Sequence, residues 1–347
     1  MGHRRKVLRV REIGLTPELF HGAVSLQRMP AGIKPWRIPY RELELYPPNG
    51  IDGKAEMTAG VRLRLRTDSV RAALTFTPLG PMQEPARFDC VVDGVLSGTA
   101  EVYEGAERVD FAGLPPGMKV MELFLPQNTG LTLTGLYVEE ETSVLPCPDL
   151  RPRWVAYGSS ITQCVAAAGP SRTWPAIAAR ESGFHLTCLG FSGNCLLEPM
   201  AARLIADQPA DLITLCVGIN VYGAAALSRR AFVPALIGLV TAIRDRQPGT
   251  PVVLISPIYA AERERTPNAL GVTVEQMRED VRETVEMLRS RGDSRLYYRS
   301  GLDWFGPKDA GLLSDGLHPD AAGYELLGAR FRKRVLGSLA AEFPQPD

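Results

Sequence analysis

Neither sign of charge is in excess in this sequence, because 39 lysine and arginine residues balance 39 aspartate and glutamate residues. Without a basic surplus, the chain lacks the electrostatic signature of a protein that binds nucleic acid or an anionic membrane. No apolar run approaches the roughly eighteen residues that a membrane span requires. The charged start at residues 1–6 is not followed by an apolar core of signal-peptide length. We therefore expect no nucleic-acid partner and no membrane partner.

Cysteine and histidine are also scarce, with six and four residues respectively. The cysteines are scattered without a C-x-x-C pair, and no spacing resembles that of metal ligands. The sequence therefore predicts no metal site, and we expect no cofactor. Cysteines of this kind are typical of reduced, mostly buried side chains, which favours a cytoplasmic protein. They are Cys90, Cys147, Cys164, Cys188, Cys195 and Cys216.

The first part of the chain reads as a β domain. With 347 residues, the chain is long enough for two domains that each have a core. Residues 61–66 alternate apolar and charged side chains, the period of a half-buried strand, and turn-rich stretches follow such segments. Many short strands at this spacing predict an antiparallel sandwich or jelly roll over residues 1–145. Further strands are predicted at residues 72–77, 88–92, 120–125 and 131–138.

A change of pattern follows. Three prolines fall within residues 145–152, and because proline fixes φ and removes a backbone donor, we predict a linker over residues 146–152. From residue 153 to 347, short apolar segments alternate with helical periodicity, which predicts an α/β domain with a parallel sheet covered by helices on both sides. The strands of this sheet are predicted at residues 154–157, 185–189, 212–217, 252–256 and 296–298.

Two helices of this α/β region are marked by periodicity. Val274, Met277 and Val281 recur at spacings of three and four among charged residues, which indicates an amphipathic helix. Tyr324 and Phe331 lie on one face of a final helix that we expect to reach Val335.

A candidate general base lies just before that final helix. Asp315 precedes His318 by three residues across Gly316. A carboxylate at this spacing can accept one ring N–H of the imidazole, which selects the tautomer and stabilises the protonated ring. If a serine lies within reach of the ring, the pair predicts nucleophilic acyl transfer.

Small and polar residues follow the predicted parallel strands, where ligands bind in open α/β sheets. A Gly-Ser-Ser turn at 158–160 follows the first strand, a Gly-Phe-Ser-Gly turn at 190–193 the second, and Gly-Ile-Asn at 218–220 the third. A serine on such a turn presents its hydroxyl. The N–H groups of that serine and of Gly193, together with the amide of Asn220, would form an oxyanion hole.

These blocks, in this order, resemble the SGNH/GDSL family of serine hydrolases over roughly residues 153–337. The resemblance implies a flavodoxin-like three-layer fold. It also implies that Ser160 attacks, that His318 is the base and that Asp315 orients it, with Ser160 N–H, Gly193 N–H and Asn220 stabilising the oxyanion. No cofactor is implied.

Two positions depart from the family pattern. Ser159 replaces the usual aspartate, and Val221 replaces the aspartate that follows Asn220. Neither departure removes a member of the triad. The first leaves two adjacent serines as candidates, and the register with the preceding glycine favours Ser160.

Taken singly, each block also fits a structural role. Asp315 is a plausible helix cap, Asn220 a turn residue, and Trp304 and Phe305 suit a substrate pocket and a core equally well. Buried packing is favoured for the thiols of Cys164 and Cys195, because no second histidine is placed to activate them. A core or edge position is favoured for His185, because it begins an apolar strand. Four coincidences in the right order favour the catalytic interpretation.

The favoured function is therefore an esterase that works through an acyl-serine on a small-molecule or carbohydrate ester. The β-rich first part resembles that of an actinobacterial subgroup that includes a salicylyl acyltransferase of tetracycline biosynthesis, and also that of carbohydrate esterases of the family. Acyl transfer to an alcohol is consequently the main alternative. A catalytically silent carbohydrate-binding protein is the third. The acyl group, the alcohol and the oligomeric state stay open.

Overall fold

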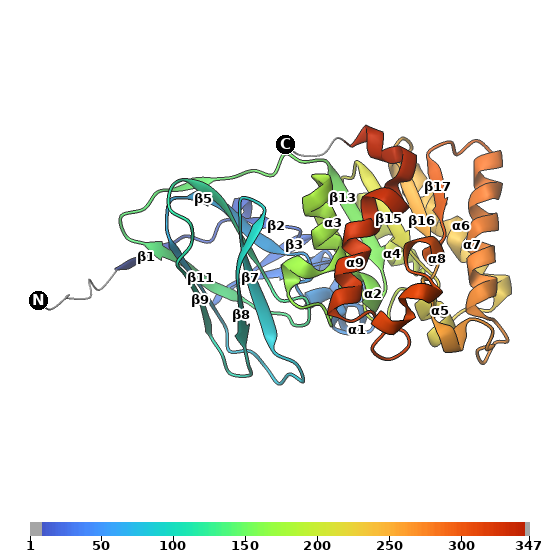
Figure 1. Cartoon of the computed structure of the whole chain (residues 1–347), viewed down its shortest axis with the longest axis horizontal. Coiled ribbons are helices and arrows are strands. Elements are labelled where there is room, and N and C mark those ends of the chain that lie inside the picture. The colour runs from blue at the N-terminus through green and yellow to red at the C-terminus, as the bar shows by residue number, and fades with distance from the viewer. Residues whose placement is uncertain (1–8, 344–347) are drawn as a thin grey trace, which may run out of the picture. The chain divides into compact units, whose positions relative to one another are not determined.

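The computed structural model describes residues 9–343, which form two compact units (Figure 1). Within the described range, the first unit contains residues 9–36, 56–149 and 169–171, and the second contains residues 37–55, 150–168 and 172–343. The division between residues 149 and 150 falls inside the predicted linker. Two segments depart from the predicted boundaries of 1–145 and 153–347, because residues 37–55 belong to the α/β unit and residues 169–171 to the β unit.

Side-chain bonds account for one of these departures. In the β unit the carboxylate of Asp89, which is fully buried, accepts hydrogen bonds from the backbone N–H and the hydroxyl of Ser171 at 2.8 and 2.7 Å. A side chain on Gly169 would collide with the same carboxylate. Because a buried carboxylate requires such donors, the short segment at residues 169–171 joins the β unit although its sequence neighbours do not.

The β unit consists of two antiparallel sheets. The first has the order β3 (Ser25–Met29), β4 (Gly32–Trp36), β11 (Leu133–Glu139), β6 (Arg71–Phe76), β9 (Arg108–Ala112), with β1 (Val10–Ile13) paired to β11. The second has the order β12 (Val144–Pro146), β5 (Arg62–Thr67), β10 (Lys119–Phe124), β7 (Ala86–Val92), β8 (Val95–Val102), with β2 (Phe20–His21) paired to β5. The strands predicted in this region are β5, β6, β7, β10 and β11. The others were not predicted.

Strand β5 shows how the alternating pattern builds this core. Leu63 and Leu65 are fully buried, as the period of two predicts. Arg62 is also buried, contrary to a simple inward–outward alternation, because its guanidinium donates to Glu122 at 2.9 Å and to Asp149 at 3.0 Å. A buried cation is tolerated where carboxylates take up its donors.

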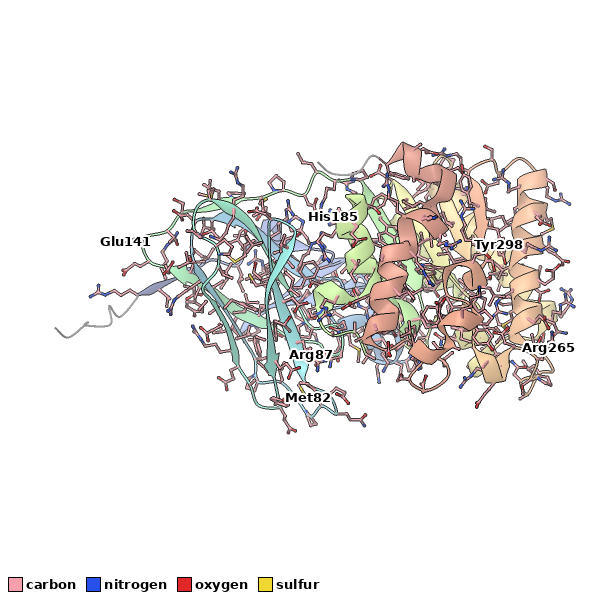
Figure 2. All side chains as sticks on the ribbon, viewed as in Figure 1. Met82, Arg87, Glu141, His185, Arg265 and Tyr298 are labelled. Carbon is pink, nitrogen blue, oxygen red and sulfur yellow. The ribbon has the colours of Figure 1, made fainter. Side chains whose placement is uncertain are left out.

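The α/β unit is built on a parallel five-stranded sheet. Its order is β14 (His185–Gly190), β13 (Arg153–Gly158), β15 (Leu212–Cys216), β16 (Val252–Ile255), β17 (Leu296–Arg299). Each predicted strand agrees with an observed one to within one residue at either end. His185 begins the edge strand β14, as expected, and Tyr298 lies on the opposite edge strand β17 (Figure 2).

Helices connect and cover this sheet. The longer ones are α3 (Trp174–Ser182), α4 (Pro199–Asp207), α6 (Arg229–Arg246), α7 (Val274–Ser290) and α9 (Ala321–Phe331), and the short ones are α1 (Asn49–Asp52), α2 (Ser160–Gln163), α5 (Ile219–Gly223) and α8 (Gly301–Trp304). The chain moves from β13 to β14 in one direction and then returns past β13 to β15. Right-handed crossovers in opposite directions put their helices on opposite faces. In agreement, α3 packs on α9, whereas α4 packs on α6 and α6 on α7 (Figure 1).

The two predicted helices are present. The amphipathic helix is α7, which begins with a capping box between Thr273 and Gln276. The final helix α9 ends at Phe331, and a π-helical turn at Arg332–Leu336 carries Val335 into the core. No helix within residues 9–343 is long and apolar enough to cross a membrane.

An aromatic cluster forms much of the core between α3, α9 and the sheet. Trp154, Trp174, Trp304 and Phe331 lie with neighbouring ring centroids 4.5–6.4 Å apart. Trp304 is buried, and its indole N–H donates to the carbonyl of Leu327. This contact decides between the two interpretations of Trp304 in favour of the core, and adjacent Phe305 is fully buried as well.

Candidate active site

The side chains of Ser160, His318 and Asp315 form a continuous chain of hydrogen bonds. The hydroxyl of Ser160 lies 2.8 Å from Nε2 of His318, and Nδ1 of the same ring lies 2.7 Å from Oδ2 of Asp315. Because the carboxylate can only accept, Nδ1 carries the proton and Nε2 is left as the acceptor for the serine hydroxyl. The contact between Ser160 and His318 thus joins residues that lie 158 positions apart in the sequence.

A tight turn before α9 fixes the orientation of the Asp315 and His318 side chains. The second carboxylate oxygen of Asp315 accepts the backbone N–H groups of Leu317 and His318 at 3.0 and 2.7 Å, and Gly316 takes a positive φ of 73° that glycine tolerates best. Asp315 is not the cap of the final helix. That role belongs to Asp320, whose carboxylate accepts the N–H of Gly323.

The environment of Asp315 favours its ionised form. Partial burial acts to raise the pKa of this carboxyl, but the backbone N–H and ring of His318 and the N–H of Leu317 outweigh it and lower the pKa to about 2. Asp315 is therefore a carboxylate at neutral pH, as the orientation of a neutral imidazole requires.

The two adjacent serines differ in what their hydroxyls contact. Ser159 is buried at the N-cap of α2, and its Oγ accepts the N–H of Ile161 at 3.2 Å. Ser160 is the first residue of that helix and contacts His318. The structure thus brings Ser160, and not Ser159, to the imidazole.

The loops that carry the three predicted oxyanion donors start side by side. Gly158 on β13 is in register with Gly190 on β14 and with Cys216 on β15. Strand β13 is the point at which the sheet order reverses, and ligands bind beside such a reversal in open α/β sheets.

Gly193 and Asn220 each have a local reason for their place. Gly193 has a φ of 75°, and a side chain there would meet no atom within 4 Å, so the requirement is conformational and not steric. The carbonyl oxygen of the Asn220 side chain accepts the N–H of Cys195 at 3.1 Å. This bond fixes the amide orientation and leaves its NH₂ group as the donor to a ligand.

Two buried side chains support these loops and were not predicted. Gln163, at the end of α2, accepts the N–H of Ser192 through its amide oxygen at 2.9 Å. Arg37 donates from its guanidinium to the carbonyl of Gly190. Neither has a sequence signal, because a single glutamine or arginine without periodicity does not indicate a contact to a loop over 25 residues away.

The departures from the family pattern and the nearby thiols have structural explanations. Ser159 caps α2, and Val221 is fully buried in α5. Cys164 and Cys195 are buried as predicted, and burial raises the pKa of both thiols above its usual value. Such thiols are poor nucleophiles near neutral pH.

Comparison with known proteins places this geometry in a family. The family model described as the GDSL-like lipase/acylhydrolase family matches residues 152–335, and the model of the SsfX3 N-terminal domain matches residues 19–134. The chain belongs to the GDSL-like lipase/acylhydrolase family. The matched range of this GDSL protein contains the loops after β13, β14 and β15 as well as the Asp315–His318 turn.

Solved structures extend the similarity of this GDSL protein to its whole length. The salicylyl-acyltransferase SsfX3 from a tetracycline biosynthetic pathway is 36% identical, with 97% of this chain and 98% of that chain covered and a TM-score of 0.88. A GDSL-like lipase structure from Bacteroides ovatus is 20% identical, with 98% and 100% covered and a TM-score of 0.79. A family two carbohydrate esterase from Cellvibrio japonicus is 16% identical, with 94% and 98% covered and a TM-score of 0.60.

The last two similarities concern the fold alone. No curated protein matches the chain significantly. The family match and the SsfX3 similarity identify the chain as an enzyme of esterase or acyltransferase type.

Proposed function

We propose that this enzyme forms an acyl ester on Ser160. The observation that carries the proposal is the hydrogen-bonded series from the Ser160 hydroxyl through His318 to Asp315. As Ser160 Oγ attacks the carbonyl carbon of an ester, His318 takes the hydroxyl proton at Nε2, and the carboxylate of Asp315 stabilises the charged ring. When the tetrahedral intermediate collapses, the bond to the leaving alcohol breaks and the alcohol takes that proton.

Three donors would stabilise the negative oxygen of this intermediate. They are the N–H of Ser160 at the start of α2, the N–H of Gly193 and the side-chain NH₂ of Asn220. Support comes from the adjacent starts of their loops and from the bond that orients the Asn220 amide. Donors fixed before the reaction need no reorganisation as charge develops, which makes them effective.

For the second step we propose an alcohol as the acyl acceptor. His318 would take the proton of the acceptor hydroxyl, whose oxygen attacks the acyl carbon; the bond from that carbon to Ser160 Oγ then breaks, and Oγ takes the proton from His318. The supporting observation is the similarity to a salicylyl-acyltransferase over almost the whole chain at 36% identity. The sequence motifs favoured hydrolysis over acyl transfer, and because of this similarity we now place acyl transfer first.

Hydrolysis is the second candidate. The side chains of His318 and Asp315 are 33% and 55% exposed, so water reaches the proposed base in the free enzyme. Hydrolase and transferase differ in how well the occupied site excludes water. The silent carbohydrate-binding alternative is dropped, because the chain is an enzyme of this family.

Two measurements test the proposal. A fluorophosphonate probe should label the protein at Ser160, and failure to label while an ordinary serine esterase labels fully would remove both candidates. Mass spectrometry should then detect an acyl-Ser160 adduct with activated acyl donors. Adding small alcohols should divert the acyl group from the free acid to the new ester. Free acid as the sole product, with every alcohol tried, would favour hydrolysis over transfer.

We also infer the finer architecture and the location. The strand order β14-β13-β15-β16-β17, with helices paired in two groups, supports a flavodoxin-like three-layer arrangement of the α/β unit. The two antiparallel sheets of the first unit support a jelly-roll-like sandwich. All six cysteines carry free thiols, which supports a cytoplasmic location.

A further inference from the structure

Arg37 is an arginine from the first tenth or so of the chain that is fully buried within the α/β unit. Its Nη1 donates to the carbonyl of Gly190, the last residue of strand β14, and lies 3.4 Å from the carbonyl of Cys188, two residues earlier in the strand. Its Nη2 donates to the carbonyl of Lys54. The guanidinium also lies over the ring of Phe191, with its carbon 4.8 Å from the ring centroid.

These contacts put one charged group at the junction between β14 and the Gly193 loop. Gly190 is the last residue of the strand and Phe191 the first of the loop. A planar guanidinium with several fixed donors and a stacking face can hold a carbonyl and a ring together in one orientation, which a lysine ammonium cannot. Burial lowers the pKa of Arg37 to about 10, so that the group is still a cation at neutral pH.

The remainder of the loop is tied to the other proposed catalytic turns. Phe191 N–H donates to the carbonyl of Gly158 at 2.8 Å, and Ser192 N–H to Gln163. Cys195 N–H donates to Asn220. Gly193 therefore lies between residues that are held from both sides, and its N–H can be placed correctly only while the start of the loop stays fixed.

Close packing increases this dependence on the start of the loop. A β-carbon on Gly190 would lie 2.4 Å from the backbone nitrogen of Gln163, in the helix that begins with Ser160. Because the two backbones touch, a shift of Gly190 is transmitted to the nucleophile turn as well as to Gly193.

We propose that Arg37 is a positioning residue for acyl transfer: by fixing Gly190 and Phe191, it holds the Gly193 N–H where the oxyanion forms. The proposal rests on the proposed acyl-serine function. It implies that segment 37–55 is part of the catalytic machinery, although it lies in the sequence of the β region.

The test uses the full-length chain with Arg37→Met and Arg37→Lys, and p-nitrophenyl acetate as the acyl donor. Rapid-mixing release of p-nitrophenol gives the acylation rate and its dependence on ester concentration. We expect Arg37→Met to lower kcat for acylation by about 10- to 100-fold, less than the 10²–10³ typical of a deleted donor, with KM changed less than about threefold. Arg37→Lys should recover part of the loss, since it keeps the charge but not the fork.

Arg203→Met is the matched control. Arg203, on α4, has a side chain that is 44% exposed, and it pairs with Glu42 of the same segment at 3.1 Å and with Asp207 of its own helix at 3.6 Å. If loosening the segment were by itself enough to slow acylation, this control would also show a loss. We expect it to retain kcat within about twofold.

A double-mutant cycle with Gly193→Ala tests the route of the effect. If Arg37 acts through Gly193, Arg37→Met should cost much less in the Gly193→Ala background than in the wild type. Independent, multiplicative losses would overturn the proposal, as would unchanged kcat in a folded Arg37→Met. If Arg37→Met does not fold, the Arg37→Lys variant provides the test. A kcat of Arg37→Lys equal to that of the wild type would then overturn the proposal. Wild-type protein that forms no acyl-enzyme would instead refute the proposed function.

Discussion

At the scale of single residues, two neighbouring serines with identical side chains make different contacts because their backbones differ. Ser159 has an extended backbone at the N-cap of α2, which turns its hydroxyl back toward the N–H of Ile161. Ser160 has entered the helix, and its hydroxyl points to His318. The chemistry of the site therefore depends on a register that sequence composition does not contain.

The two serines should respond differently to replacement by alanine. Ser160→Ala should abolish labelling by a fluorophosphonate and formation of the acyl-enzyme. Ser159→Ala removes one N-cap bond, worth about 1 kcal/mol, and should keep most of the labelling rate. Labelling followed by mass spectrometry of the modified peptide checks both, and a dead Ser159→Ala beside an active Ser160→Ala would reverse the assignment.

Asn220 should act on turnover and not on folding. Asn220→Ala removes a proposed oxyanion donor and frees the N–H of Cys195, so kcat should fall by about 10²–10³. Circular dichroism should stay that of the wild type, and the melting temperature should fall only modestly, because an unpaired N–H costs about 1–3 kcal/mol. Turnover that does not change would exclude Asn220 from the oxyanion hole.

Asp315 has a pH dependence that follows from its environment. Its pKa is lowered from 3.8 to about 2 in the folded protein, so its stabilising contribution is complete above about pH 4 and is lost as the pH falls toward 2. We therefore expect no titration of Asp315 in the activity profile between pH 5 and 9. Asp315→Asn should lower kcat by about 10²–10⁴ across that range, and parallel pH profiles of kcat for both proteins provide the measurement.

At the scale of elements, strands were predictable where burial imposes a pattern. The five strands of the parallel sheet are short apolar runs, because helices cover both faces, and they were located to within one residue. Strand β8 has Ser97, Gly98 and Thr99 in its middle and is largely exposed. It carries neither an apolar run nor an alternation, so only its pairing with β7 makes it a strand.

Gly190, which ends β14, and Gly193, in the loop that follows, make a pair of contrasting tests. Gly190→Ala would put a β-carbon 2.4 Å from a backbone nitrogen of α2, whereas Gly193→Ala would enter open space at a φ of 75°. The second change should cost about 1–2 kcal/mol from left-handed strain. The first should lower the melting temperature further, since two backbones must separate. Thermal unfolding of both variants decides, and equal losses would contradict the contact between Gly190 and α2.

At the scale of the whole molecule, the predicted cut between a β half and an α/β half is simpler than the observed one. Each unit contains a short segment from the part of the sequence that otherwise forms the other unit. Residues 37–55 join the α/β unit around buried Arg37, and residues 169–171 join the β unit around buried Asp89. Neither charged residue stands out in the sequence, because burial is what gives it importance.

The stability of the whole molecule should depend on pH through His21. Burial is the largest cause that lowers the pKa of His21 from 6.5 to about 4, and Arg62 adds to it while Asp149 opposes it. The unfolded chain takes up a proton at a higher pH than the folded one, so stability is lost as the pH falls from 6.5 to 4. Urea unfolding across this range should show a shallower dependence for His21→Gln. An identical dependence would contradict the shift.

The sequence by itself determined the change from a β region to an α/β region, the five strands of the parallel sheet, and the four motif blocks that carry the resemblance to the GDSL family. These features depend on local periodicity and on residues that lie close together along the chain. Only the tertiary structure showed that Ser160, which the register with the glycine had favoured, contacts the imidazole, that Trp304 belongs to the core, and that Arg37 bonds to Gly190 at the start of the Gly193 loop. Contacts of that kind join residues far apart in the chain, and their energy comes from burial and hydrogen-bond geometry that exist only after folding.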